Sequence, residues 1–524
     1  MVSFTSKISG TDPDFGPGQR FISALRGKRV CGAGYSGKAV PAVFLGIVSL
    51  AVGNGMFGKV LNSIVLLIVV GLTGCMKKPG PFETLEDYRR AFSSRKTSEI
   101  VLAGKVLTLQ NAVEFALLNN PTNLAAAQAV LAAKYGYYRA VSAYAPEINV
   151  VSSVGHTLSQ GRDLKNPPVG VMKRNDHLVT SGGIRAGYLL FDGFARELET
   201  MIARQEYDKS IAAGENVRRL LERAVAFAYF DMYLAAEEIV IYKEDLDFQN
   251  TALRQEEQRF RSGHVSKASV LNFQILAARA KSNISNARYR RQVAFHALAA
   301  LMGCEVRQLE HLSLQKISLK DLPYIQDDIF YLELAISNRP DLKAEKMALN
   351  IAYRNRQKAI ADFLPQIRLF TEYSQHFYKA EYGGYRVSDA HSNQGVFTYG
   401  VEGQWNIFRG FDSLNQLRQR EVLEKIAMWG VNARFLEIVE EVRDSRANCA
   451  NSRYQIELFQ EMAQWVQEQR DLIFSEYTNG RETIARLNEA QNILVEAQRM
   501  LVVSVVEFNK SLAQLAAATG TNIK

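Results

Sequence analysis

The chain carries one long pattern twice. The segment from about Leu107 to Gly303 recurs from about Ile329 to Gly520, with different residues but with prolines and glycines at matching places. A period of about 200 residues is far longer than the roughly 20 to 50 residues of a solenoid repeat. We therefore expect one large structural unit that is used twice. The matching segments keep a nearly constant offset along the chain and are Asn120-Pro121 with Arg339-Pro340, Ala145-Pro146 with Leu364-Pro365, Phe191-Asp192-Gly193 with Phe408-Arg409-Gly410, Phe260-Arg261-Ser262-Gly263 with Tyr477-Thr478-Asn479-Gly480, and Leu301-Met302-Gly303 with Ala518-Thr519-Gly520.

Two stretches of the chain have the composition of very long helices. No proline lies between Pro168 and Pro323 or after Pro365, and within these stretches Gly214 is the only glycine between Ala195 and Ser262 and Gly430 the only one between Phe411 and Asn479. Proline and glycine are the residues that most disfavour a helix interior. A helix from Arg196 to Ser262 would be on the order of 100 Å long, so it must pack sideways against other helices. Apolar residues spaced alternately by three and four, as in a coiled coil, are Val217, Leu221, Ala224, Ala228, Met232, Ala235, Ile239, Tyr242 and Leu246, and later Leu494, Ala497, Leu501, Val505, Phe508, Leu512 and Leu515.

Each repeat also contains two stretches with a two-residue period. Strands of about ten residues with one apolar and one polar face are typical of a transmembrane barrel. The alternative is a β-sandwich whose polar face is exposed to bulk water. The polar segments 160–177 and 379–394 are expected to be loops. Two strands per repeat give four per chain, which cannot close a barrel, whereas three copies would give twelve strands around water. The apolar positions are Ile367, Leu369, Tyr373 and Phe377, then Phe397, Tyr399, Val401, Trp405 and Ile407, with weaker patterns at 147–159 and 178–191.

The amino-terminal region has the features of an export signal. Residues 60–72 form an apolar core preceded by Lys59, which is too short for a comfortable membrane span. The core ends in Leu72-Thr73-Gly74-Cys75, the order of a bacterial lipobox, so acylation of Cys75 would tether the chain to a bilayer. A short anchor followed by a chance cysteine is the alternative. The sequence leaves open whether translation starts at Met1 or Met56.

These features divide the chain into six predicted segments. Residues 1–74 are a leader and lipoprotein signal peptide, 75–106 a lipid-anchored arm, 107–303 the first repeat, 304–328 a linker, 329–520 the second repeat and 521–524 a tail. The fold class is mainly α with a transmembrane β part, built from a duplicated unit of helix, two strands and a long helical hairpin.

Charge and motif content argue against two other classes of protein. The net charge is +9, but residues 1–74 hold seven Lys or Arg and two Asp or Glu, and the remaining charges are interspersed. Nucleic acid is therefore not an expected partner. The seven histidines do not cluster with carboxylates at metal-ligand spacing, and no catalytic signature is present. We expect no metal, no cofactor and no enzymatic activity, and Cys304 and Cys449 are expected to be small buried residues.

Together these segments resemble the TolC-like outer-membrane efflux proteins, in their lipoprotein branch. The resemblance covers residues 105–520 and rests on the helix openings LTLQNAVEFALLNNP and LELAISNRP, the proline before each strand pair, the aromatic-x-Gly corners and the hairpin tips. It implies a homotrimer whose twelve-stranded barrel in outer-membrane lipid continues as a helical tube into the periplasm. It also implies a periplasmic adaptor and an inner-membrane RND or ABC pump, with drugs, metals or proteins as cargo. A lipid-anchored coiled-coil scaffold without a pore is the alternative.

The resemblance places the periplasmic mouth at the two hairpin tips. Adaptor contacts would then fall on Gly263, His264, Ser266, Gly480 and Thr483. Family members often carry an acidic residue six positions after the tip glycine, where this chain has Ser269 and Arg486, so the polar ring could instead come from Asn272 and Glu489. A ring containing Arg486 would favour anions, or be latched by Glu482 or Glu489, because rings of charge set pore selectivity. An ordinary solvated charge is the alternative. Weaker candidates for the constriction are Tyr477 and Arg481.

Overall fold

The computed structural model describes residues 106–162, 172–305, 313–317, 322–382 and 390–521. The chain divides into two compact units, Met1–Pro81 and Phe82–Lys524, and all of the described residues belong to the second. The predicted signal peptide, the acylation site Cys75 and nearly all of the predicted arm lie outside the described residues.

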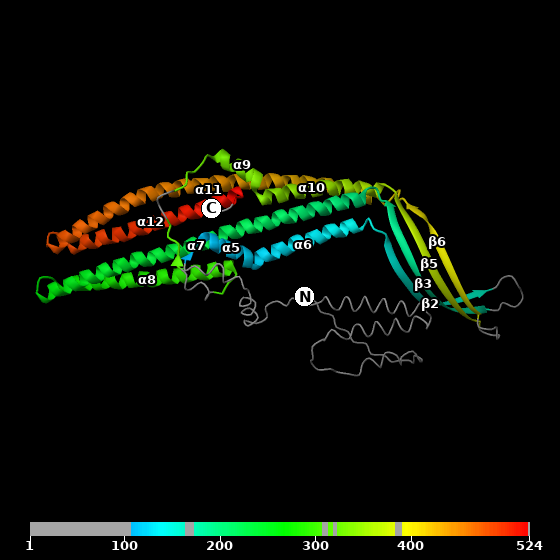
Figure 1. Cartoon of the computed structure of the whole chain (residues 1–524), viewed down its shortest axis with the longest axis horizontal. Coiled ribbons are helices and arrows are strands. Elements are labelled where there is room, and N and C mark those ends of the chain that lie inside the picture. The colour runs from blue at the N-terminus through cyan, green and yellow to red at the C-terminus, as the bar shows by residue number, and fades with distance from the viewer. Residues whose placement is uncertain (1–105, 163–171, 306–312, 318–321, 383–389, 522–524) are drawn as a thin grey trace, which may run out of the picture. The chain divides into compact units, whose positions relative to one another are not determined.

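The helices and strands of the second unit confirm the predicted duplication (Figure 1). The long helices α7 and α11 both have 67 residues, and their hairpin partners α8 and α12 both have 36. The first repeat comprises α5 (Leu109–Asn119), α6 (Pro121–Ser142), β2 (Glu147–Arg162), β3 (Met172–Phe191), α7 (Ala195–Arg261) and α8 (Lys267–Met302). The second comprises α9 (Asp328–Asn338), α10 (Pro340–Ile360), the 3-10 turn η3 (Ala361–Phe363), β5 (Gln366–Tyr382), β6 (Ala390–Gln404), α11 (Asp412–Thr478) and α12 (Ile484–Thr519).

Local chemistry sets the helix boundaries. Thr108 caps α5 because its hydroxyl accepts a hydrogen bond from the Asn111 amide at 3.2 Å. Pro121 and Pro340 open α6 and α10, where a missing amide hydrogen costs nothing. Gly303 and Gly520 end α8 and α12 with positive φ angles of 64° and 70°.

The four long strands form one antiparallel sheet in the order β2-β3-β5-β6. β3 and β5 pair directly, so the two repeats are joined at the centre of the sheet. The strands extend into the segments predicted as loops, because β2 continues to Arg162, β3 begins at Met172, β5 continues to Tyr382 and β6 begins at Ala390. Polar residues there are compatible with a barrel wall because one of its faces meets water.

A second, very small sheet lies at the level of the short helices. β1 (Val106–Leu107) pairs in parallel with β4 (Ser313–Leu314), which belongs to the predicted linker. The Tyr229 hydroxyl on α7 donates to the Leu107 carbonyl at 3.1 Å. This contact lies in the largest apolar core, which also contains Phe115 and Met302. The start of the first repeat is thereby fixed to both helices of the first hairpin.

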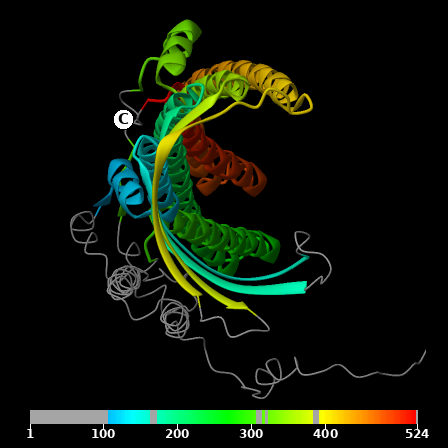
Figure 2. The same cartoon turned by 90° about the vertical axis from the view of Figure 1, so that its right-hand side faces the viewer.

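The long helices run from the sheet to the hairpin tips (Figure 1). Near the sheet, α6 packs on α7, α7 on α10 and α10 on α11. Toward the tips, α8 packs on α7, α7 on α12 and α12 on α11. Figure 2 shows this array end-on as an arc, with α9 on its convex side.

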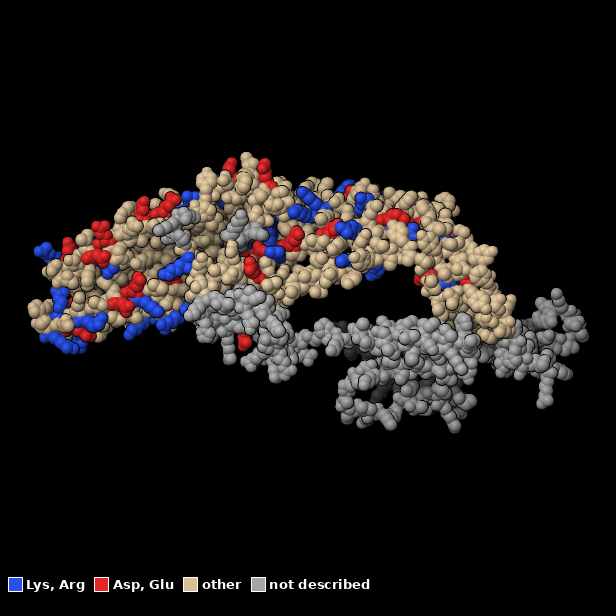
Figure 3. Space-filling model, viewed as in Figure 1, with Lys and Arg blue, Asp and Glu red and all other residues tan. Residues whose placement is uncertain are grey.

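Among the described helices, α12 alone is long and apolar enough to cross a membrane. It packs against α7 and α11, so helix packing accounts for its apolar residues. Charged side chains lie mainly over the helices on the face shown in Figure 3, and few lie over the strands.

Candidate functional site

The sheet has one apolar and one polar face, as predicted. Val150, Ile184, Tyr373 and Phe397 lie in one row across the four strands and are exposed. The adjacent row points to the other face and contains Arg185 opposite Glu372, whose side chains form an ion pair at 2.6 Å. A sheet with an exposed aromatic face suits lipid on that side and water on the other.

The two corners between sheet and helices are copies of one another. Phe194 and Phe411 have positive φ angles of 66° and 65°, which are uncommon for bulky residues. Each packs edge-to-face on the phenylalanine that begins its aromatic-x-Gly corner, Phe191 or Phe408, with ring centroids 5.5 Å apart. Exposed aromatic residues at this level are typical of the interface between membrane and water.

The two hairpin tips also share one backbone geometry. Gly263 and Gly480 have φ angles of 78° and 74°, a region that glycine enters without steric cost. The His264 amide donates to the Arg259 carbonyl, and the Arg481 amide donates to the Glu476 carbonyl, both at 2.9 Å. The predicted tip residues His264, Ser266 and Thr483, like both glycines, are exposed.

Tyr477 lies in the packing between the two hairpins. Its ring is buried with Phe273 and Leu487, and its hydroxyl donates to the Glu256 carboxylate at 2.8 Å. Glu256 is only 1% exposed, and the Arg259 guanidinium lies 5.5 Å from the Tyr477 ring centroid. Burial, followed by the hydrogen bond to Glu256, raises the pKa of Tyr477, so the hydroxyl remains a donor at neutral pH.

This contact has no counterpart in the other repeat. Phe260 occupies the place equivalent to Tyr477, and Ile473 occupies the place equivalent to Glu256. The hydroxyl and the carboxylate are both missing from those equivalent positions. Tyr477 was among the predicted constriction residues and Glu256 was not. The signal for Glu256 was a carboxylate at a position where the second repeat has an apolar residue.

The remaining predicted gate residues lie around the start of the second helix of each hairpin. The Arg486 guanidinium is 3.8 Å from the Glu482 carboxylate. The backbone amide of Arg486 donates to the hydroxyl of Thr483, which caps the helix, at 3.3 Å. A cation in the first turn of a helix is unfavourable to the helix dipole, and Glu482 offsets this. Arg481 and Glu489 are exposed, and Ser269 and Asn272 are half-buried.

A polar layer that the sequence analysis missed links the hairpins further from the tips. The amide nitrogens of Gln249 on α7 and Gln491 on α12 donate to the Asp245 carboxylate at 3.1 and 2.9 Å. Both glutamines are buried. Within the described residues, no group of His, Cys, Asp and Glu is arranged to hold a metal ion.

A second missed cluster lies where α9 meets α10. Arg339 is 1% exposed, and its guanidinium donates to both oxygens of Asp341, to Glu441 and to the Ala518 carbonyl. Asn120, at the equivalent place in the first repeat, donates to the Leu301 carbonyl at 2.8 Å. Leu301 and Ala518 are themselves equivalent positions of the two repeats, so the two side chains anchor equivalent helix ends.

The fold and its two-faced sheet define a class of protein: a subunit of a channel that crosses an outer membrane and extends as helices into the periplasm. Comparison with family models agrees. The chain belongs to the outer membrane efflux protein family, whose model matches residues 112–304 and 331–521. Comparison with curated proteins gives no significant match.

Solved structures of outer-membrane proteins share this fold. VceC from Vibrio cholerae is 18% identical, with a TM-score of 0.65, over 79% of this chain and 97% of that chain. CmeC from Campylobacter jejuni is 16% identical, with a TM-score of 0.67, over 79% and 86%. MtrE from Neisseria gonorrhoeae, solved in an open state, is 19% identical, with a TM-score of 0.59, over 79% and 89%.

Proposed function

We propose that three copies of this chain assemble into one exit duct through the outer membrane. The observation that carries this proposal is that the protomer has two open edges at every level, one from each repeat. In the sheet these edges are β2 and β6. Near the sheet the outermost helices are α6 and α11, and toward the tips they are α8 and α11.

The joint between copies can repeat the joint that already exists within the chain. Inside the chain, β3 pairs with β5, α7 packs on α10 and α7 packs on α12. The duplicated equivalents are β6 with β2, α11 with α6 and α11 with α8 of the neighbouring copy. A head-to-tail contact that repeats by rotation closes into a ring, and closure removes sheet edges that lipid cannot accommodate.

The open helix edges carry apolar side chains with a period of seven residues. They are exposed in the protomer, as expected for the seam of a coiled coil before its partner arrives. On α6 they are Leu124, Leu131 and Tyr138; on α11 they are Val422, Trp429 and Leu436, and further along Leu458, Trp465 and Leu472.

The width of the barrel interior sets the smallest number of copies. Two copies would give eight strands, whose interior is about wide enough only for side chains, and three would give twelve. A duct that passes solutes therefore needs at least three. Acylation at Cys75 would tether each copy to outer-membrane lipid.

The hairpin tips are the proposed periplasmic mouth. The Tyr477–Glu256 hydrogen bond joins the hairpins within one chain, and the residues at the equivalent joint between copies are Phe260 and Ile473. The mouth would then have three joints held by this hydrogen bond and three joints without it. Its charged ring would contain Arg486 paired to Glu482. The exposed tip residues would contact a periplasmic adaptor that connects the duct to an RND or ABC pump. The duct itself performs no catalysis.

Planar-bilayer recordings of the purified chain test this function. We expect heat-resistant trimers that conduct ions and that raise drug tolerance in cells lacking their own duct. Monomers without conductance would refute the duct and favour a scaffold. Arg486→Ala tests the ring, with the equivalent Ser269→Ala as the matched control; unchanged ion preference in the arginine variant would refute its part in the mouth.

A further inference from the structure

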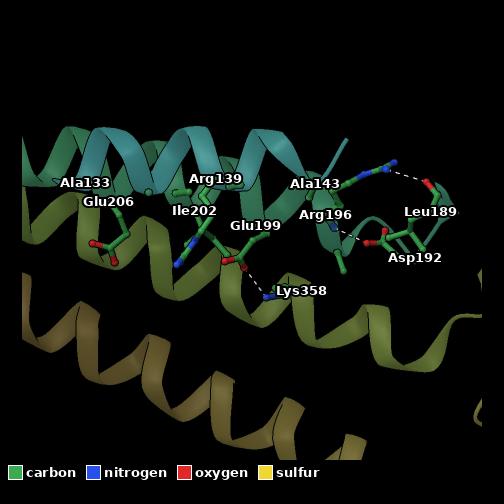
Figure 4. Close-up of a pocket in the computed structure, with 14 residues that line it drawn as sticks. Ala133, Arg139, Ala143, Leu189, Asp192, Arg196, Glu199, Ile202, Glu206 and Lys358 are labelled. Carbon is green, nitrogen blue, oxygen red and sulfur yellow. Dashed lines mark hydrogen bonds and ion pairs between the residues drawn. The ribbon is translucent and has the colours of Figure 1, made fainter. Parts of the chain in front are cut away.

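A groove of about 560 Å³ lies between α6, α7 and α10, at the ends of these helices that are nearest the sheet (Figure 4). Small residues of α6, including Ala133, Gly136 and Ala140, leave the space, and Ile202 of α7 forms part of its wall. Leu189 also lines it, and Leu189 pairs with Arg368 in the sheet register, which places it on the polar face. The groove therefore opens to the side that faces water in a closed barrel.

The charges in this groove are balanced. The cations are Arg139, Arg196 and Lys358, and the anions are Asp192, Glu199 and Glu206. Lys358 pairs with Glu199 at 2.6 Å, as Figure 4 shows.

Two of the remaining charged groups serve the local structure. The Asp192 carboxylate accepts a hydrogen bond from the Arg196 amide at 2.9 Å. The Arg196 guanidinium donates to the Leu189 carbonyl at 2.9 Å and lies over the Tyr144 ring. Arg139 is exposed and forms no ion pair with any described residue.

The duplication provides an equivalent groove between copies, with a different charge. There α10, α11 and α6 of the neighbouring copy take the places of α6, α7 and α10. Lys358 takes the place of Arg139, and Arg139 of the neighbouring copy takes the place of Lys358. The three carboxylates are replaced, Asp192 by Arg409, Glu199 by Gln416 and Glu206 by Leu423.

Other substitutions leave this second groove cationic. Arg420 replaces Ala203, while Asp412 and Asp362 replace Ala195 and Ala143. Lys358 already pairs with Glu199 of the first groove, so three cations (Arg139 of the neighbouring copy, Arg409 and Arg420) face two carboxylates, and one of these, Asp412, pairs with Arg409 at 3.8 Å. Glu199 is the pairing carboxylate of the first groove, and in the second groove the corresponding Gln416 cannot neutralise the neighbouring Arg139.

We propose that the three grooves between copies bind organic anions, such as sulfonates, phosphates or carboxylates, in transit through the duct. This inference rests on the proposed trimer, because the neighbouring copy supplies Arg139. Cationic groups on the wall of a water-filled passage concentrate anionic solutes. Ala352 and Ala359 of α10, which take the places of Ala133 and Ala140, leave room for an organic body beside the charge, and Leu423 offers apolar contact.

The test measures binding of pyranine, an aromatic trisulfonate, to detergent-purified trimers by fluorescence anisotropy at low and high salt. We expect three sites per trimer that weaken with salt. Arg139→Gln and Gln416→Glu should each weaken binding about fivefold, since each removes one exposed charge interaction. Glu199→Gln should strengthen binding by converting the groove within the chain to the cationic type.

Lys134→Gln is the matched control, because Lys134 lies on the same helix but over the Tyr138 ring, outside the groove. Trimers that bind no pyranine, or that bind it equally in the Gln416→Glu variant, would refute the groove and leave the duct intact. A chain that remains monomeric would refute the assembly and the groove with it.

Discussion

Replacing Tyr477 by Phe removes one hydroxyl from the joint between the two hairpins of a chain. The hydroxyl donates at 2.8 Å to Glu256, which is 1% exposed and has little access to replacement water. A hydrogen bond to a charged group contributes about 1.5–3 kcal/mol, and a loss of about 2 kcal/mol changes an equilibrium roughly 30-fold. If this contact holds the mouth closed, Tyr477→Phe should favour a state in which the two hairpins of a chain are separated at the tips by about this factor. We expect longer openings and a larger mean single-channel current.

The first repeat offers a matched control. Phe260 occupies the position equivalent to Tyr477, but the residue equivalent to Glu256 is Ile473, so Phe260→Tyr adds a hydroxyl that meets no carboxylate at the joint between copies. It should form no new hydrogen bond across that joint and should not lower the current. In a double-mutant cycle, Tyr477→Phe should have little further effect once Glu256 is replaced by Ile, the residue at the equivalent place. A Tyr477→Phe channel that opens no more often than the parent would show that this contact does not hold the mouth closed.

Three further predictions concern the region between sheet and tips. Arg339→Met should lower stability toward urea by about 3 kcal/mol, because two carboxylates lose their buried partner. Arg356→Met, which breaks a half-buried pair with Glu424, should cost clearly less, about 1 kcal/mol. Equal losses would contradict the role of the buried Arg339. Burial alone would raise the pKa of Asp341, but Arg339 and Arg219 outweigh it and lower the pKa. The stabilisation from the ionised Asp341 is therefore complete above pH about 4 and is lost as pH falls further. The free energy of unfolding measured against pH should fall over this range in the parent protein but not in Arg339→Met. Burial raises the pKa of Cys304 to about 12, so its thiol should resist maleimide at neutral pH until the chain unfolds, and rapid labelling of the folded protein would contradict its burial.

Much of the fold could be predicted because prolines and glycines mark the chain at regular offsets. Pro121 and Pro340 can only open their helices, and the tip glycines occupy a backbone region that other residues rarely enter. Strand length was harder to predict. The polar ends of the strands look like loop sequence, because a strand facing water on one side and leaving the membrane needs no apolar signal.

The site was less predictable, because its contacts join residues far apart in sequence. The sequence indicated Tyr477 through its place before a tip glycine, but its partner Glu256 is 221 residues away. Arg339 was visible only as the residue before a proline, and its ion pairs depend on Glu441, 102 residues further on. Such partners could have been sought by comparing the two repeats and noting where a charged residue replaces a neutral one.

We expect three copies to close into a ring through a joint that repeats the one within the chain. Lys358 and Glu199 mark the internal joint at 2.6 Å, and their equivalents between copies are Arg139 and Gln416. Cysteines placed at both of these positions and treated with a short bis-maleimide should give cross-linked dimers and trimers on denaturing gels, with no species above three copies. Single-cysteine variants should give neither. The absence of cross-links between copies, or a ladder that continues past three, would contradict the closed ring.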